Sequence, residues 1–223
     1  MKTAKIQVAL VDYMGTDLTV VNAARVSFDK ESDWLPPNTA RGYVLRPEDV
    51  KLIVYLAKHN HWSPFAHTSV QLRVKAPIFV ARQLVKHQVG GVWNEVSRLY
   101  VNDEPEFYLP ELWRGKPVNA KQGSNGEVDD QSLCHSELAD ITERALETYA
   151  MLLDNGVAPE QARMVLPLNA MTEWIWTGSL VFWARVCKLR LDAHAQSETA
   201  DVARLIDPII ASQFPESWKA LMA

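Results

Sequence analysis

Cysteine and long apolar runs are both scarce in this chain. Its 223 residues include two cysteines, Cys134 and Cys187, and no Cys-x-x-Cys spacing. A disulfide framework and a thiolate zinc site are therefore both unsupported. The N-terminal segment is too polar for a signal sequence, and the most apolar stretch, 174–184, is far shorter than the roughly 20 residues of a membrane helix. We therefore expect a soluble protein of a reducing compartment, the cytoplasm, with no membrane partner.

Several common binding and catalytic signatures are also missing. The sequence contains no G-x-G-x-x-G, G-x-x-x-x-G-K-[ST], G-x-S-x-G or H-E-x-x-H motif, so any dinucleotide must be held without a Rossmann turn or a P-loop. The spacings of His59, His61 and His67 match no common metal site, and we predict none. A general acid–base or ligand-contact role for one loop histidine is favoured instead. The formal net charge of −4 gives no reason to expect a nucleic-acid partner.

What the chain does contain is an ordinary globular composition, 48% hydrophobic and 22% charged, with an unusual eight tryptophans. Alternating apolar residues predict strands over 5–13 and 70–74. Because strands come early and helices late, we predict one α+β domain over 1–223, with an antiparallel or mixed sheet before a helical C-terminal half. Helical spacing and caps predict helices over 18–25, 47–58, 77–87, 132–154 and 197–212, the last interrupted near Pro208, and a buried central helix over 172–191.

Two clusters of cations are candidates for an anion site. Arg82 and Lys86 are i,i+4 neighbours on the predicted helix 77–87, and the glycines and polar residues of 90–98 follow them. That combination suits a nucleotide, but a solvated helix end before a polar turn explains it slightly better on residue types alone. Arg185 lies in the most apolar predicted helix, close to Arg190, so it must pair or meet a ligand. We therefore expect a buried anionic site there.

Several blocks of sequence together resemble the flavin-dependent thymidylate synthases. They occur in the family's order over most of the chain, and their combination is far more specific than any one of them. The blocks are AARVSFD (23–29), HNHWSPFAH (59–67), VKAPIFVARQLVKHQ (74–88), NEVSRLY (94–100), FYLP (107–110), ARMVLPLN (162–169) and LRLDAHAQ (189–196).

The resemblance implies the fold of the flavin-dependent thymidylate synthases and a reductive methylation reaction. Such enzymes convert dUMP to dTMP, taking the methylene from methylenetetrahydrofolate and the hydride from FAD that NADPH has reduced. They are homotetramers whose active sites are shared between subunits. They use no covalent nucleophile, because an arginine polarises the uracil until C5 itself becomes nucleophilic. That agrees with Cys134 and Cys187, neither of which has the Pro-Cys-Gln setting of the cysteine-dependent synthases.

The resemblance also assigns roles to residues of this chain. Arg190 corresponds to the uracil-activating arginine, and His61 to a loop histidine near the flavin and folate. Flat side chains near these positions, Trp62 and Trp93, are candidates for stacking, whereas Trp174, Trp176 and Trp183 are expected only to pack. The dUMP positions are Gln83, Lys86, Glu95, Ser97, Arg98, Arg163 and Arg190, and the flavin positions are Ser63, Lys86, His87, Gln88, Glu95, Ser179 and Arg185.

The chain departs from the family signature at three points. Lys86-His87-Gln88 stands for Arg-His-Arg, and one extra residue precedes Ser97. Lysine lacks the bidentate fork of arginine, and Gln88 carries no charge. Leu99 stands where the family has an arginine, and we hypothesise that Arg98 supplies that phosphate contact. These departures leave open the alternative that the protein is a nucleotide- and flavin-binding relative with weakened or lost synthase activity. The histidines leave a second alternative, a metal-dependent hydrolase.

Overall fold

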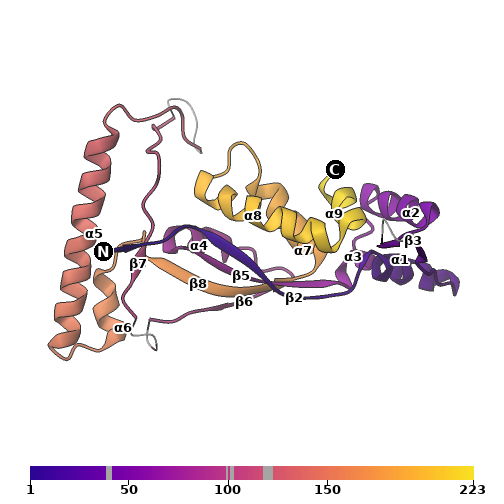
Figure 1. The fold of residues 1–223 in the computed structure, drawn as a ribbon, viewed down its shortest axis with the longest axis horizontal. Helices are drawn as coiled ribbons and strands as arrows, with labels where there is room; N and C mark the ends of the chain where they lie inside the picture. The colour runs from indigo at the N-terminus through magenta and orange to yellow at the C-terminus, as the bar shows by residue number, and fades with distance from the viewer. Residues whose placement is uncertain (39–41, 99, 101–102, 118–122) are drawn as a thin grey trace.

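The central feature of the computed structural model is a four-stranded antiparallel sheet in the order β2-β5-β8-β6. The structure describes residues 1–38, 42–98, 100, 103–117 and 123–223. The sheet is drawn across the middle of Figure 1, and its strands come from both halves of the sequence. They are β2 (Gln7–Met14), β5 (Ser69–Pro77), β6 (Gly91–Glu95) and β8 (Met171–Gly178).

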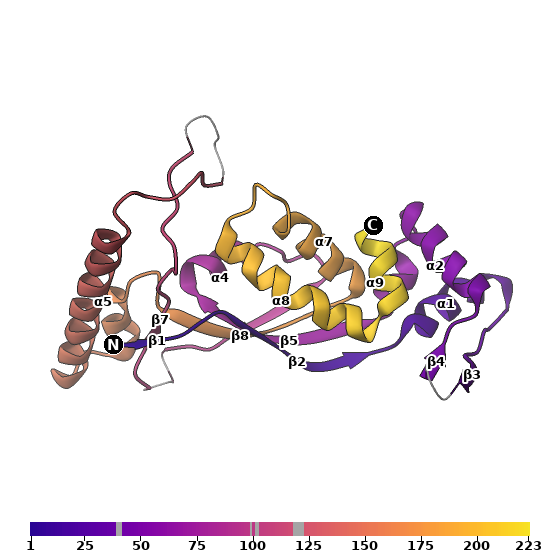
Figure 2. The same cartoon turned by 45° about the horizontal axis from the view of Figure 1, so that its top comes forward.

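Helices cover one face of this sheet. Figures 1 and 2 both show them on the same side of the strands. Strand β5 explains this placement, because Val70, Leu72 and Val74 are fully buried and alternate with the exposed Arg73. The covering helices are α4 (Ile78–Leu84), α7 (Leu180–Arg190), α8 (Ser197–Gln213) and α9 (Pro215–Met222). The buried side chain of Asp17 caps α9 by accepting hydrogen bonds from the amides of Glu216 and Ser217, at 3.0 and 2.9 Å.

The remaining elements lie at the two ends of the sheet (Figure 2). One end carries α1 (Asp17–Arg25), a 3₁₀ turn (Val26–Phe28), the antiparallel pair β3 (Leu35–Asn38) and β4 (Gly42–Val44), α2 (Pro47–Lys58) and α3 (Ser63–Ala66). The other end carries the parallel pair β1 (Lys2–Thr3) and β7 (Glu106–Phe107), α5 (Gln131–Asp154), α6 (Pro159–Ala162) and a 3₁₀ turn (Arg163–Val165).

The structure confirms the α+β class but corrects the predicted central helix over 172–191. Its first half is β8, which pairs with β5 and β6, and only its second half is the helix α7. Trp174 and Trp176 point to the same face of the strand and are both 1% exposed. Their spacing of two residues is the strand period, and aromatic and β-branched residues favour strands. The two tryptophans do pack in the core, but from a strand.

Two paired glycines explain why the chain turns from β8 into α7 where it does. Gly178 is the register partner of Gly91 on β6, and the ring of Phe182 lies over both. A Cβ atom at Gly178 would meet that ring within 2.1 Å, and one at Gly91 within 2.4 Å. Ser179 then caps α7 by accepting a hydrogen bond from the amide of Phe182 at 3.4 Å. Gly91, one of the glycines in the segment 90–98 that was a candidate for nucleotide binding, makes room for a core phenylalanine instead.

Other boundaries differ more modestly from expectation. Helix 47–58 is found with the predicted limits, whereas the helix predicted over 77–87 ends at Leu84. Strand β6 and helix α9 had no prediction. Helix α8 continues through Pro208, because the fully buried Ile206 and Ile210 hold it on the sheet despite the missing amide hydrogen. Among the described residues no helix is long and apolar enough to cross a membrane.

Candidate functional site

A polar cleft of about 610 Å³ lies where α4, the end of α7 and the start of α8 meet. Helix α7 ends at Arg190, and a short connection brings the chain back to α8 past His194 and Gln196. The cleft thus collects cations from segments far apart in the sequence. Its chemistry-bearing lining residues are Gln83, Lys86, Arg114, Arg190, His194 and Gln196.

Arg190 is held in one orientation at the wall of this cleft. Its Nε donates to Nε2 of His87 at 3.0 Å, and its Nη2 donates to the backbone carbonyl of Gln83 at 3.3 Å. Partial burial lowers the pKa of Arg190 from its usual value, but a guanidinium remains a cation at neutral pH. Burial, followed by the charges of Arg190 and Arg185, also lowers the pKa of His87.

A chain of hydrogen bonds orients the side chain of Gln83, whose backbone carbonyl accepts from Arg190. The Gln83 amide donates to Oε1 of Gln196 and accepts from Oγ1 of Thr199 at 3.2 Å. Gln196 in turn donates to Glu198 at 3.0 Å, and Arg114 donates to the other oxygen of Glu198 at 2.6 Å. Burial acts to raise the pKa of Glu198, yet the hydrogen bonds from Arg114 and Gln196 leave it lowered overall. The result is an ionised, 7% exposed carboxylate that contacts two residues of the cleft wall, Arg114 and Gln196.

Arg114 and Glu198 have no counterpart among the residues expected from the sequence. Glu198 falls within the helix predicted over 197–212, and neither residue was assigned a role from the sequence. The two are far apart in the sequence, and no spacing rule connects them. Only the fold of 103–117 over the start of α8 brings them together.

A smaller pocket of about 240 Å³ adjoins the cleft through Lys86. His87, Gln88 and Arg185 also line it, so four of the expected flavin positions meet here. The prediction of a buried anion site around Arg185 was wrong. Its side chain is exposed and donates to the carbonyl of Val89, because α7 is covered on one face only.

Glu95, Ser97 and Arg98 belong to a different part of the molecule, at and beyond the end of β6. Glu95 is exposed and accepts from Oγ1 of Thr172 at 2.6 Å. Arg98 donates to the carbonyl of Asp103 and lines a separate pocket of about 310 Å³. Leu99 lies outside the described residues, so its departure from the family signature has no structural description.

Helix α3, which begins at Ser63 shortly after His61, lies toward one end of the molecule, and α6, directly before Arg163, lies at the other (Figure 1). His61 and Ser63 are exposed at the start of α3, next to Trp62, which is 64% exposed. Arg163 is also exposed and donates to the carbonyl of Glu160 at 3.2 Å. Apart from Ser179, which caps α7, the expected site residues therefore form four separated groups in one chain, around the cleft, at the end of β6 and at each of the two extremities.

Trp93 and Cys187 are both engaged in packing within the protein, unlike the cations that line the cleft. Trp93 stacks on Trp174 with ring centroids 4.2 Å apart, so one face of Trp93 is already used within the protein. Cys187 is fully buried, and burial raises the pKa of its thiol. Within the described parts of the chain, no group of three or more histidine, cysteine or carboxylate side chains is placed to hold a metal ion.

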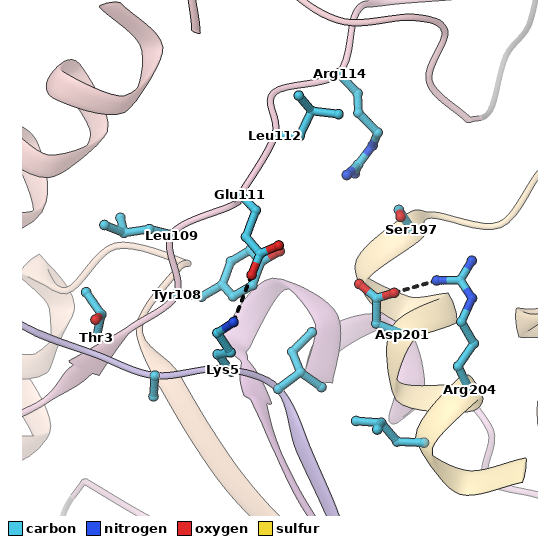
Figure 3. Close-up of a pocket in the computed structure, with 13 residues that line it drawn as sticks. Thr3, Lys5, Tyr108, Leu109, Glu111, Leu112, Arg114, Ser197, Asp201 and Arg204 are labelled. Atoms are coloured by element: carbon cyan, nitrogen blue, oxygen red, sulfur yellow. Dashed lines mark hydrogen bonds and ion pairs between the residues drawn. The ribbon is translucent and has the colours of Figure 1, made fainter. Parts of the chain in front are cut away.

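A second large pocket, of about 840 Å³, lies beside the cleft and shares Arg114 and Ser197 with it (Figure 3). Its cations are all neutralised by neighbours. Lys5 pairs with Glu111 at 2.9 Å, and Arg204 pairs with Asp201, as the dashed lines in Figure 3 show. Arg114 pairs with Glu198. The cleft at Arg190, and not this pocket, therefore has the charge that suits an anionic ligand.

Comparison with known proteins connects this cleft to a family. A family model described as thymidylate synthase complementing protein matches residues 9–216. The flavin-dependent thymidylate synthase of Thermus thermophilus is 41% identical over 213 residues, covering 96% of this chain and 74% of that protein. The enzyme of the same name from Thermosipho africanus is 38% identical over 217 residues, covering 96% and 89%.

A solved structure agrees with these matches. The UMP/dUMP methylase PolB from Streptomyces cacaoi, crystallised with 5-Br dUMP, superimposes with a TM-score of 0.84 at 33% identity, covering 99% of this chain and 96% of that one. The sequence matches and the shared fold extend over nearly the whole chain and include the segments that build the cleft. This chain belongs to the family of flavin-dependent thymidylate synthases.

Proposed function

We propose that this protein methylates dUMP at C5 to give dTMP, with methylenetetrahydrofolate as the carbon donor and with FAD, reduced by NADPH, as the source of hydride. The observation that carries this proposal is the fixed guanidinium of Arg190 at the wall of a cationic cleft. The names of the relatives and the nucleotide bound to PolB support the same substrate class. We also propose that residues 1–223 act as one domain.

The chain's own residues account for two demands of this reaction. A uracil carbonyl oxygen facing Arg190 would gain negative charge as C5 becomes nucleophilic, and a preoriented guanidinium stabilises that charge without reorganising. Arginine suits the role because it does not deprotonate at neutral pH. The exposed ammonium of Lys86, on the same cleft, is available to the phosphate. No thiolate is required, in agreement with the buried Cys187.

The smaller pocket has donors that fit a flavin dinucleotide. Lys86 and Arg185 are both exposed cations that line it, as a diphosphate requires. When bound, FAD supplies the hydride that completes the methyl group. The pocket, at about 240 Å³, holds only part of such a cofactor, so other segments must complete the site.

We propose that further copies of the chain supply those segments, in a homotetramer with shared active sites. His61, Ser63 and Arg163 are exposed at the extremities of one chain, away from Arg190. Glu95, Ser97 and Arg98 line or adjoin a separate pocket. In this arrangement Arg98 contacts the dUMP phosphate from a neighbouring copy. If Arg98→Ala left the KM for dUMP unchanged, that assignment would be wrong.

The direct test is tritium release from C5-tritiated dUMP together with dTMP formation, with FAD, methylenetetrahydrofolate and NADPH present. UMP should be assayed in parallel, because PolB is described as a UMP/dUMP methylase. We expect turnover by the wild type and its loss in Arg190→Ala. Lys188→Ala is the matched control, since Lys188 is an exposed cation on the same helix whose Nζ donates to the carbonyl of Ala223 at 3.3 Å. Flavin and dUMP binding without turnover in the wild type would favour the alternative of a relative that has lost synthase activity.

A further inference from the structure

We propose that His87 is a positioning residue, which as a neutral imidazole with its proton on Nδ1 holds Arg190 in its reactive orientation. This inference rests on the proposed function, because it concerns how Arg190 is presented to the uracil. It assigns His87 a task that differs from the flavin contact implied by its place in the Lys86-His87-Gln88 block.

The geometry of the contact determines which nitrogen of His87 carries the proton. Nε of arginine always carries a hydrogen and can only donate. At 3.0 Å from Nε2 of His87, it needs a lone pair on that nitrogen, so the imidazole must be neutral with its hydrogen on Nδ1. An imidazolium at this position would place two donors and two positive charges against each other.

The charges around His87 favour that neutral form. Arg190 and Arg185 approach from α7, and Lys86 is its neighbour on the turn that follows α4. From β8 the ring of Trp176 packs against it, with ring centroids 6.4 Å apart. Burial is the largest cause of the lowered pKa of His87, and the two arginines add to it. The imidazole therefore stays an acceptor through the neutral range.

His87 is itself well placed to define the position of Arg190. Its amide donates to the carbonyl of Leu84 at 3.0 Å, which anchors it directly after α4. The second donor of Arg190 binds the carbonyl of Gln83, one turn earlier. Two acceptors from one segment thus hold two nitrogens of the guanidinium. This leaves rotation about the side-chain bonds of Arg190 little freedom and keeps its remaining donors available to the cleft.

Substitution separates this role from a structural one. His87→Leu removes the acceptor, and we expect kcat for dTMP formation to fall on the order of 10- to 100-fold, as for loss of a hydrogen bond to a charged group. His87→Gln retains an acceptor at similar reach and should recover most of kcat. The KM for dUMP and the affinity for FAD should change little in either variant. A wild-type kcat in His87→Leu would overturn the proposal, as would a loss of activity explained by loss of flavin.

The pH profile adds a second readout. Below the pKa of His87 the imidazole gains a proton and ceases to accept from Arg190, so kcat of the wild type should decline there, at a pH below the usual value near 6.5. His87→Gln has no such proton to gain and should lack this acidic decline. An identical acidic limb in both proteins would overturn the proposal.

The third readout does not depend on turnover. Solid-state NMR of the holoenzyme with ¹⁵N-labelled histidine, assigned by comparison with His87→Gln, should show His87 at neutral pH as a neutral ring protonated on Nδ1. A ring protonated on Nε2, or on both nitrogens, would overturn the proposal. Absence of dTMP formation by the wild type, with the expected tautomer at His87, would instead count against the proposed function, so the two failures are distinguishable.

Discussion

Expected site residues occur both in the cleft between α4, α7 and α8 and at the turn that begins α3. The two regions differ in how firmly the rest of the chain orients these side chains. In the cleft, Arg190 makes two hydrogen bonds, and both ends of the Gln83 amide are engaged. At the turn, His61 and Ser63 are exposed, and the ring of His61 lies near those of Tyr55 and His59.

This difference separates two kinds of functional residue. The side chains of the cleft are oriented by the chain's own packing, and a charge-stabilising group requires such preorganisation. In the shared-site arrangement proposed above, the side chains of the turn would become oriented when a ligand or another copy of the chain covers them. Substitutions in the cleft should therefore change catalysis and stability together, whereas substitutions in the turn should change activity alone.

The largest expected effect is at Arg190. Arg190→Lys retains a charge but loses the two donors that bind His87 and Gln83, so even this conservative change should raise the barrier by about 3 kcal/mol. Measured kcat values should then fall more than a hundredfold, with flavin still bound. A lysine variant within tenfold of wild type would show that charge alone suffices and that preorganisation in the cleft is unimportant.

The second effect concerns the ion pair between Arg114 and the buried Glu198. Arg114→Met leaves the carboxylate of Glu198 without its cation, and we expect the free energy of unfolding in urea to fall by about 2 kcal/mol. The double variant with Arg114→Met and Glu198→Gln should lose less free energy of unfolding than Arg114→Met alone, because no unpaired buried charge remains. The pKa of Glu198 is lowered in the folded protein, so its contribution is present above the usual carboxyl pKa and is lost as the pH falls through the lowered value. Equal losses in the single and double variants at neutral pH would show that the pair is not coupled.

A smaller effect is expected at the exposed turn. His61→Ala should leave the free energy of unfolding within about 0.5 kcal/mol of wild type, while turnover falls about tenfold through a lost ligand contact. His59→Ala is the matched control, since His59 is equally exposed but is not a predicted site residue. A large loss of stability in His61→Ala would contradict the contrast drawn between the two regions.

The smallest effect should come from the cysteines. Neither region contains a thiolate, and burial raises the pKa of Cys187. The variant with Cys134→Ser and Cys187→Ala should keep wild-type kcat and lose only about 1 kcal/mol of stability, from the small space left at Cys187. Loss of turnover in this variant, with flavin still bound, would contradict a mechanism without a covalent nucleophile.

Local patterns predicted several elements well. Pro47 and the acids that follow it mark the start of α2, and the alternation of Val70, Leu72 and Val74 marks a half-buried strand. The apolar run that contains Trp174 and Trp176 was wrongly predicted to be helical. A strand that is buried by both neighbouring strands and by the helices is as apolar as a buried helix. Arg185 was misplaced for the same reason, since a buried helix over 172–191 would have had no exposed face.

The sequence by itself determined the family and the α+β class and supplied the candidate site residues, because these are recorded in residue types and short spacings. Only the tertiary structure decided how they are grouped. It joins His87 to Arg190 and Arg114 to Glu198, and it leaves α3, shortly after His61, and α6, directly before Arg163, toward opposite ends of the molecule. Long-range packing places these side chains, and no local pattern in the chain encodes a contact between residues that are distant in sequence.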